Sequence, residues 1–424
     1  MRVKRFLITD YPRNGKVDAN VVRVLSAASE AFLNGPFLPC LRSLQIESQD
    51  PWSAHLLLSD RLRKVIIDLG NDLTLAHKTI ISTLSIKSPM LTHVECLQAS
   101  VFDQSAHVAL SAIVHNMRKL RVVCFPSHAL TTTALSYLAS LPNLHTATLF
   151  IPEKQPYSKA IATLDAPFAP LQAITLHSAG WDDLIAFTEQ VVPAYIREFA
   201  ATVPINQQAI ITAAQLRQLT SILAAKRTLT SIVLNDNNAN IIRGWGQSNF
   251  SPLDMMPLLS CSGLEHLSLE LYCAEAEFGD AFVHSLAKAL PKLRYLAFFP
   301  ALNDSVIYPS NCTPLSMLHM AQHCPHLESL SITPNSENFN DWAVGDFRAP
   351  EVRYLQVGNA RLETRFVKKM ALFLSTIFPN LQHIAWGHRY TGRQSSLSWA
   401  EVTELLAYGV KIRDQERAWM AKGQ

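Results

Sequence analysis

The densest group of potential metal ligands is His319, His323, Cys324 and His326, all within eight residues. Imidazole nitrogens and a thiolate are ligands that suit zinc. The group spans the expected end of a helix, however, because Pro325 stops the helix there. Side chains on the two sides of such a helix-to-strand turn point in different directions. We therefore expect neither a metal site nor a bound cofactor.

The adjacent carboxylates of Asp182 and Asp183 are the best candidates for an acid–base pair. Leu184, Phe187 and Val191 follow them at helical spacing, which places both acids in a first helical turn that favours negative charge. The chain has no Walker-type glycine loop, no Gly-x-Ser-x-Gly elbow and no His-Glu-x-x-His motif. We predict a protein that binds rather than one that catalyses.

The recurrent signal in the chain is a short phrase, in which one apolar residue is followed by two more at offsets of three and five. It occurs thirteen times between Leu41 and Trp386. Its first positions lie about 28 residues apart, the period of a leucine-rich repeat. The clearest copies are Leu41, Leu44, Ile46; Leu264, Leu267, Leu269; Leu293, Leu296, Phe298; Leu327, Leu330, Ile332; and Leu381, Ile384, Trp386. Weaker copies begin at Leu62, Leu91, Leu120, Leu144, Leu171, Ile196, Leu229 and Val352.

Each repeat is expected to hold one helix and one short strand. In seven copies a proline lies two residues ahead of the first apolar position. Proline ends the preceding helix, and an extended segment begins after it. Successive strands joined by crossover helices run parallel, and helices are wider than strands, so the stack must curve. We predict an α/β leucine-rich-repeat solenoid, a horseshoe with a parallel concave β-sheet and helices on the convex face.

One continuous repeat domain is expected over residues 1–397, with about 13–14 irregular repeats, because a solenoid extends a single core through neighbouring units. Residues 398–424 are expected to form a capping helix and a polar tail. Ser398 and Glu401 read as a capping box at the start of that helix, and Arg413 begins the polar tail, which we expect to fray. The face that would cover the last repeat consists of Trp399, Val402, Leu405, Leu406 and Tyr408.

Composition narrows the class of protein further. The 424 residues include 48% hydrophobic residues, yet no run approaches the eighteen or so apolar residues of a membrane span. The net charge of +3 has both signs interspersed, so we expect no nucleic-acid partner and no membrane partner. The seven cysteines are scattered and include no Cys-x-x-Cys pair, which favours reduced thiols. The N-terminus has no secretory h-region, so we expect a cytoplasmic and/or nuclear protein.

A binding surface can be located from the alternation of side chains along a strand. Residues between the leucines face the concave side, and in the C-terminal half they include aromatic and hydrogen-bonding types that interfaces favour. Three long connections, 235–251, 300–313 and 333–349, carry further aromatics. The alternative is that these aromatics fill gaps between strands or that the loops cover the rim. The predicted partner-binding residues are His266, Glu270, Tyr295, Phe299, Tyr354, Gln356 and His383 on the concave face, and Trp245, Tyr308 and Trp342 in the loops.

The run Cys-Pro-His-Leu-Glu-Ser-Leu-Ser-Ile at 324–332 and its relatives at 290–296 and 378–384 resemble the repeats of fungal F-box/leucine-rich-repeat proteins. The resemblance implies the substrate-recognition region of an SCF (cullin-RING) ubiquitin ligase subunit, with a protein substrate on the concave face and the C-terminal loops. No F-box-like helix precedes the first repeat, so a Skp-type adaptor and a cullin are expected only if an F-box lies upstream. The alternatives are a stand-alone leucine-rich-repeat binding module and a small-GTPase regulator resembling the Ran GTPase-activating protein.

Overall fold

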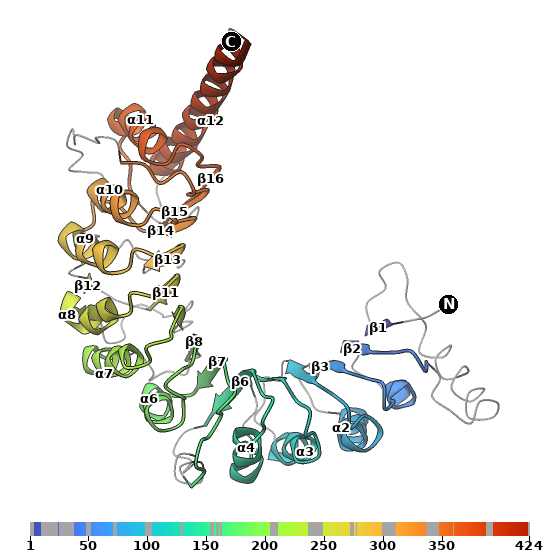
Figure 1. Ribbon diagram of the computed structural model, residues 1–424. Coiled ribbons are helices and arrows are strands. Elements are labelled where there is room, and N and C mark those ends of the chain that lie inside the picture. The colour runs from blue at the N-terminus through green and yellow to red at the C-terminus, as the bar shows by residue number, and fades with distance from the viewer. Residues whose placement is uncertain are drawn as a thin grey trace. The chain divides into compact units, whose positions relative to one another are not determined.

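The computed structural model describes residues 4–9, 24, 38–47, 52–70, 74–97, 104–127, 130–152, 157, 161, 163–203, 211–235, 249–271, 275–276, 278–298, 311–335, 347–358, 360–386 and 393–422. The chain divides into two compact units, Met1–Ile196 and Arg197–Gln424. Each unit contributes seven described strands that pair side by side in chain order. Within each unit the helices lie on one side of these strands (Figure 1).

The first unit runs from β1 to α6. Its strands pair in parallel, for example Leu44 opposite Val65 and Val94 opposite Val123. The strands are β1 (Arg5–Thr9), β2 (Ser43–Glu47), β3 (Lys64–Asp68), β4 (His93–Leu97), β5 (Val122–Phe125), β6 (Thr146–Ile151) and β7 (Ala173–Ser178). The helices are η1 (Trp52–Leu57), α2 (Leu75–Lys87), α3 (Gln104–Val114), α4 (Thr132–Ala139) and α6 (Trp181–Gln190).

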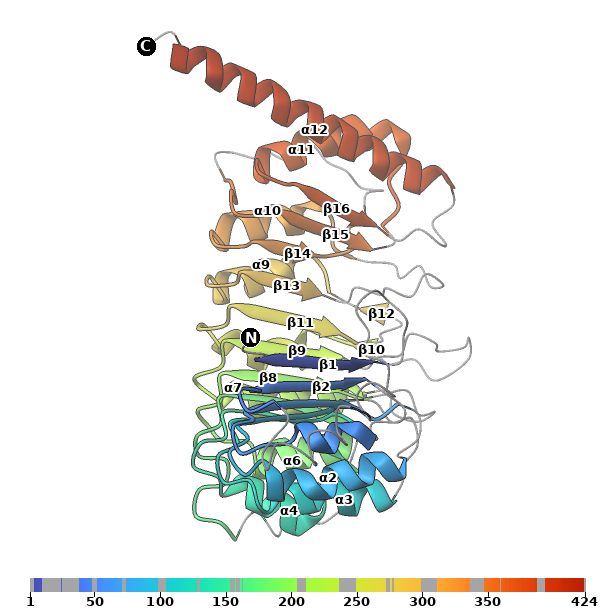
Figure 2. The same ribbon diagram turned by 90° about the vertical axis from the view of Figure 1, so that its right-hand side faces the viewer.

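The second unit follows the same plan, and the arrowheads of its strands point the same way (Figure 2). The strands are β8 (Glu198–Thr202), β9 (Ser231–Asn235), β11 (His266–Glu270), β13 (Tyr295–Phe298), β14 (Ser329–Ser331), β15 (Tyr354–Gly358) and β16 (His383–Trp386), beside a separate pair, β10 (Asn249–Phe250) and β12 (Glu275–Ala276). The helices are α7 (Ala213–Ala224), α8 (Pro252–Met255), η2 (Met256–Ser260), α9 (Asp280–Ala289), α10 (Pro314–His323), η3 (Thr364–Phe366), α11 (Val367–Ile377) and α12 (Arg393–Lys422).

The repeat phrase explains why the strands pair as they do. Its middle apolar residue occupies the same register position in consecutive strands, so that Leu267, Leu296 and Leu330 lie side by side. All three are at most 1% exposed between sheet and helices. Burying one such side chain stabilises the fold by about 1.5–3 kcal/mol. The prediction of an α/β leucine-rich-repeat solenoid with a parallel sheet is therefore confirmed.

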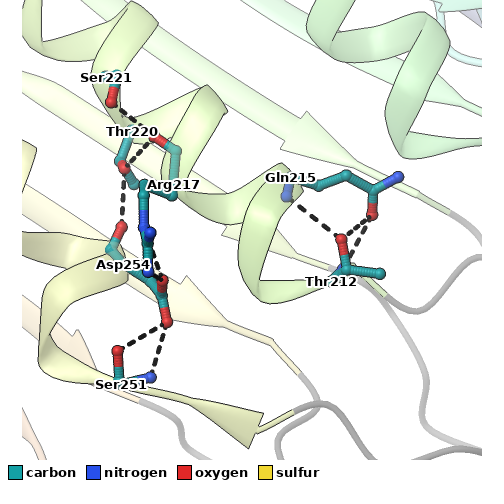
Figure 3. Close-up of polar contacts among 7 residues, drawn as sticks. All are labelled: Thr212, Gln215, Arg217, Thr220, Ser221, Ser251 and Asp254. Carbon is teal, nitrogen blue, oxygen red and sulfur yellow. Dashed lines mark hydrogen bonds and ion pairs between the residues drawn. The ribbon is translucent and has the colours of Figure 1, made fainter.

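Helix starts are fixed by side chains that satisfy the first backbone amides. At α7, Thr212 Oγ1 accepts from the amide of Gln215, whose side-chain oxygen accepts from the amide of Thr212 at 2.9 Å (Figure 3). At α8 the amide of Ser251 donates to Asp254 Oδ2 at 2.8 Å, which joins the two ends of the first turn. In α6, Asp182 and Asp183 lie in the first turn, as the sequence predicts.

The C-terminal helix differs from the prediction at both ends. Since α12 begins at Arg393, Ser398 lies inside the helix and is buried, so the predicted capping box is wrong. The helix also continues to Lys422 through the segment that was expected to fray. Trp399 is 1% exposed and its Nε1 donates to the Ala360 carbonyl at 2.9 Å.

Only part of the predicted covering face of α12 is buried. Val402 and Leu406 are buried, and the helix packs against α11. Tyr408, by contrast, is 64% exposed, so its assignment to that face is wrong. Among the described residues, no helix has both the length and the apolar character that crossing a bilayer requires.

Candidate functional site

The free face of the second unit is the side of its sheet that bears no helices. Because strand residues alternate, the leucines point to the core and the residues between them to this free face. The register sorts those residues into three rows, which we number from the start of the strands. The first row is Glu198, Ser231, His266, Tyr295, Ser329, Tyr354 and His383. The second is Ala200, Val233, Ser268, Ala297, Ser331, Gln356 and Ala385, and the third is Thr202, Asn235 and Glu270.

His266 and Tyr295 form the centre of the first row. Their ring centroids are 4.2 Å apart with 22° between the planes, so the two rings are stacked. Burial lowers the pKa of His266 below its ordinary value, although the charge of Glu198 works in the opposite direction. Burial also raises the pKa of Tyr295, and the charge of Glu270 adds to that rise. The pair therefore presents a neutral imidazole and a protonated phenol at neutral pH.

The carboxylate of Glu270 is held in place by two donors. Asn235 Nδ2 donates to Oε2 at 3.0 Å, and Ser268 Oγ donates to Oε1 at 3.2 Å. Neither partner is charged, so the carboxylate keeps its negative charge available to a ligand. This position is one strand away from Tyr295, whose pKa it raises.

Six of the ten predicted partner-binding residues lie on described strands of the free face. The structure brings His266, Tyr295 and Glu270 into one neighbourhood. Tyr354 is 39% exposed, and His383 is exposed beside it in the register. Gln356 is half-buried in the second row. The remaining four, Phe299, Trp245, Tyr308 and Trp342, lie outside the described residues.

A polar cluster on the corresponding face of the first unit was not predicted. Lys64 Nζ lies 3.2 Å from Glu95 Oε1, and His93 Nε2 contacts the same oxygen. Burial raises the pKa of Glu95, but the hydrogen bonds and charges of His93 and Lys64 outweigh it and leave the pKa below its usual value. Aligning the repeat phrases would have found the cluster, since Lys64 is paired with His93 in the register.

The residues of the rejected metal site point to three different places. Cys324 is buried, and burial raises the pKa of its thiol to about 12. His326 lies 3.5 Å from the carboxylate of Glu351. His319 and His323 turn instead toward His284 of the preceding helix, with 3.1 Å between the Nδ1 atoms of His284 and His319. In the part of the chain that the structure describes, no group of three or more His, Cys, Asp or Glu residues is arranged to hold a metal ion.

Comparison with known proteins gives relatives in structure alone. No protein-family model matches the chain, and no curated protein matches it. Among solved structures, the complex of Rad7 and Elc1 from yeast matches with a TM-score of 0.50 at 15% identity, over 90% of this chain and 86% of that one.

Two further structures match with lower TM-scores. The complex of TLR13 with ssRNA13 has a TM-score of 0.48 at 13% identity, over 91% of this chain and 49% of that one. An internalin, InlF of Listeria monocytogenes, has a TM-score of 0.36 at 13% identity, over 85% of this chain and 80% of that one. At these identities the similarity concerns the fold, and the class that fold and register define is the leucine-rich-repeat solenoid.

Proposed function

We propose that this protein is a non-catalytic leucine-rich-repeat binding protein that captures a protein partner on the free face of its second unit. The observation that carries the proposal is the first row of that face. There the His266–Tyr295 stack, the exposed residue Tyr354 and the exposed His383 share one register row, in which Ser329 separates Tyr295 from Tyr354. Aromatic side chains with a polar end are the residue types that dominate binding energy at protein interfaces.

Its more specific role, on this proposal, is substrate recognition for an SCF-type ubiquitin ligase. Support comes from the resemblance of the repeats to those of fungal F-box/leucine-rich-repeat proteins. The similarity in fold to yeast Rad7, whose structure is a complex with Elc1, is consistent with it. The protein partner would occupy the free face and the C-terminal loops, while a Skp-type adaptor and a cullin would bind only if an F-box lies upstream. Such a subunit would act in the cytoplasm and/or nucleus.

The second candidate is a stand-alone binding module without ligase recruitment. The free face of the second unit supports both candidate functions equally, because capture of a partner requires only that face. The two candidates differ in what else the protein binds. A ligase subunit must carry an adaptor and a cullin whatever happens at the free face.

Quantitative affinity purification from the native host tests the proposal. The full-length protein is compared with a Tyr295→Ala/Tyr354→Ala variant and with Ser43→Ala, a matched change at the equivalent row of the first unit. The expected result is loss of the captured partner by the double variant alone, with adaptor and cullin retained in all three samples. Retention of every captured protein by the double variant would contradict the assignment of this face. If adaptor and cullin were absent from all samples, the ligase role would be wrong and the stand-alone binding module would be the better assignment.

A further inference from the structure

The open side of the Tyr295 ring is the starting point for an inference about the ligand. His266 belongs to β11, and its ring covers the face of Tyr295 that points toward that strand, at a centroid distance of 4.2 Å. The opposite face of the Tyr295 ring therefore points toward β14. The register partner on β14 is Ser329, whose side chain is too short to cover an aromatic ring.

The next strand carries the second tyrosine of the row. Tyr354 on β15 is the register partner of Ser329, so the order across three strands is Tyr295, Ser329, Tyr354. Two strand spacings separate the tyrosines, which is about 9.6 Å at the backbone. A flat group stacked between two rings needs about 7–8 Å, twice the optimal carbon–carbon separation. By backbone spacing, the interval over Ser329 between the two tyrosines, which we call the Ser329 gap, is wide enough for one planar group.

The charges on the free face indicate the sign of that group. Among the described strand residues of the three rows there are two glutamates, Glu198 and Glu270, and no lysine or arginine. Arg294 directly precedes Tyr295, but alternation directs it away from the face and it pairs with Glu328. A cation over Ser329 would lie between two tyrosines, with the Glu270 carboxylate two strands away on β11 and no lysine or arginine among the described strand residues of this face.

We propose that the Ser329 gap receives the guanidinium group of an arginine side chain of the protein partner, sandwiched between Tyr295 and Tyr354. Arginine suits the gap better than lysine because its guanidinium is planar and stacks on aromatic rings, whereas an ammonium is a compact and strongly hydrated charge. The charge of Glu270 reaches Tyr295, whose pKa it helps to raise, and it would attract the same cation through space. The inference rests on the proposed function, since it names the chemistry by which that face recognises its partner.

Labelled hexa-arginine and hexa-lysine peptides test this preference, since they carry the same charge and differ in the shape of the cation. Fluorescence anisotropy with the full chain should show tighter binding of hexa-arginine by about fivefold or more, the factor that stacking of roughly 1 kcal/mol provides. Tyr354→Ala and Ser329→Leu should abolish the preference, the second by filling the gap. Tyr354→Phe, which keeps the ring, should retain it. Ser43→Leu, a matched insertion of leucine in the first unit, should also leave it unchanged.

Three results would overturn the inference. The first is equal binding of the two peptides, and the second is a preference for hexa-arginine that survives Ser329→Leu. The third is displacement of hexa-arginine by N-acetyl-tryptophanamide but not by N-acetyl-argininamide, because the gap would then take a neutral ring. Thermal unfolding of each variant checks that it is folded, and Tyr354→Ala, at an exposed position, tests the gap even if Ser329→Leu disturbs the sheet.

Failure of the inference can be told from failure of the proposed function. If Tyr354→Ala loses the captured partner while the two peptides bind equally, the face binds a partner through other chemistry and only the inference is wrong. If the captured partner is retained by both Tyr354→Ala and Ser329→Leu, the face itself has been assigned wrongly.

Discussion

Arg217 and Asp254 join helices α7 and α8 through a buried carboxylate. Arg217 Nε and Nη2 both donate to Asp254 Oδ1, at 3.1 and 2.7 Å, while Ser251 occupies the other carboxylate oxygen (Figure 3). The Asp254 residue is 1% exposed, whereas the Arg217 side chain is 57% exposed. The arginine therefore brings the compensating charge from the surface to an acid that cannot reach water itself.

Replacing Arg217 with alanine should lower the free energy of unfolding of the second unit by about 1–3 kcal/mol, because a buried charged acceptor loses its charged donor. Urea denaturation of the native chain and the variant measures this difference. Asp254→Asn in a double-mutant cycle should show that most of the effect depends on the carboxylate. The control Arg227→Ala, at an exposed position just after α7, should stay within about 0.5 kcal/mol. Equal effects of the two arginine substitutions would contradict a structural role for this pair.

The core of the second unit should be far less tolerant than its free face. Leu267 is fully buried and lies beside Leu296 in the register. Leu267→Asp removes about 1.5–3 kcal/mol of apolar burial and places an unpaired charge in the core, so cooperative unfolding of the second unit should disappear. Ser231→Asp, on the free face one strand away, is the matched control. Circular dichroism melting and limited proteolysis check both, and a folded Leu267→Asp protein would contradict the register.

The repeat phrase was sufficient to predict the strands because it is repeated and because each copy constrains its neighbours. A single Leu-x-x-Leu-x-Leu run is weak evidence for a strand. Thirteen successive runs, however, allow only one register between neighbouring strands in which all the leucines are buried. The same reasoning placed both His266 and Tyr295 on the concave face. What it could not give is the stacking of their rings, since side-chain rotamers depend on packing across strands.

Features outside the phrase were predicted less well. The Ser398–Glu401 pattern is local, but nothing between Arg393 and Leu397 stops a helix from starting earlier, since that stretch has neither glycine nor proline. The meeting of His284 with His319 depends on how α9 and α10 are rotated toward each other. Strand register does not fix that rotation, because connections between repeats vary in length.

The single left-handed glycine of the last strands should be sensitive to a methyl group. Gly358 has a φ of +54°, and a Cβ there would lie 2.7 Å from Thr333 Oγ1. Gly358→Ala should destabilise the second unit by about 1–3 kcal/mol, as measured by chemical denaturation. Adding Thr333→Ala should relieve only the close contact, so most of the loss should remain. Gly409→Ala, in the helix α12 with nothing within 4 Å, should instead stabilise by up to about 1 kcal/mol.

The histidine cluster of α9 and α10 should make the second unit sensitive to mild acid. The rings of His284 and His319 are 4.4 Å apart, those of His284 and His323 are 5.0 Å apart, and His323 Nε2 is buried without a hydrogen-bond partner. Burial lowers the pKa of His319, as does His284, while Asp280 opposes the shift. Burial lowers the pKa of His323 as well, and His284 and Lys288 contribute to the same direction.

A histidine whose pKa is lowered on folding binds more protons when unfolded. Its contribution to stability is therefore complete above the ordinary value of 6.5 and is lost as pH falls toward the folded pKa. The native chain should lose more thermal stability between pH 7.5 and 5.5 than a His319→Gln/His323→Gln variant, and a difference of roughly 2 °C would correspond to about 1 kcal/mol or less. This window lies above 4.5, the ordinary pKa of a carboxyl such as Glu95. His145→Gln, at an exposed position, should follow the native chain, and parallel melting curves for all three proteins would show that the cluster does not respond to protons.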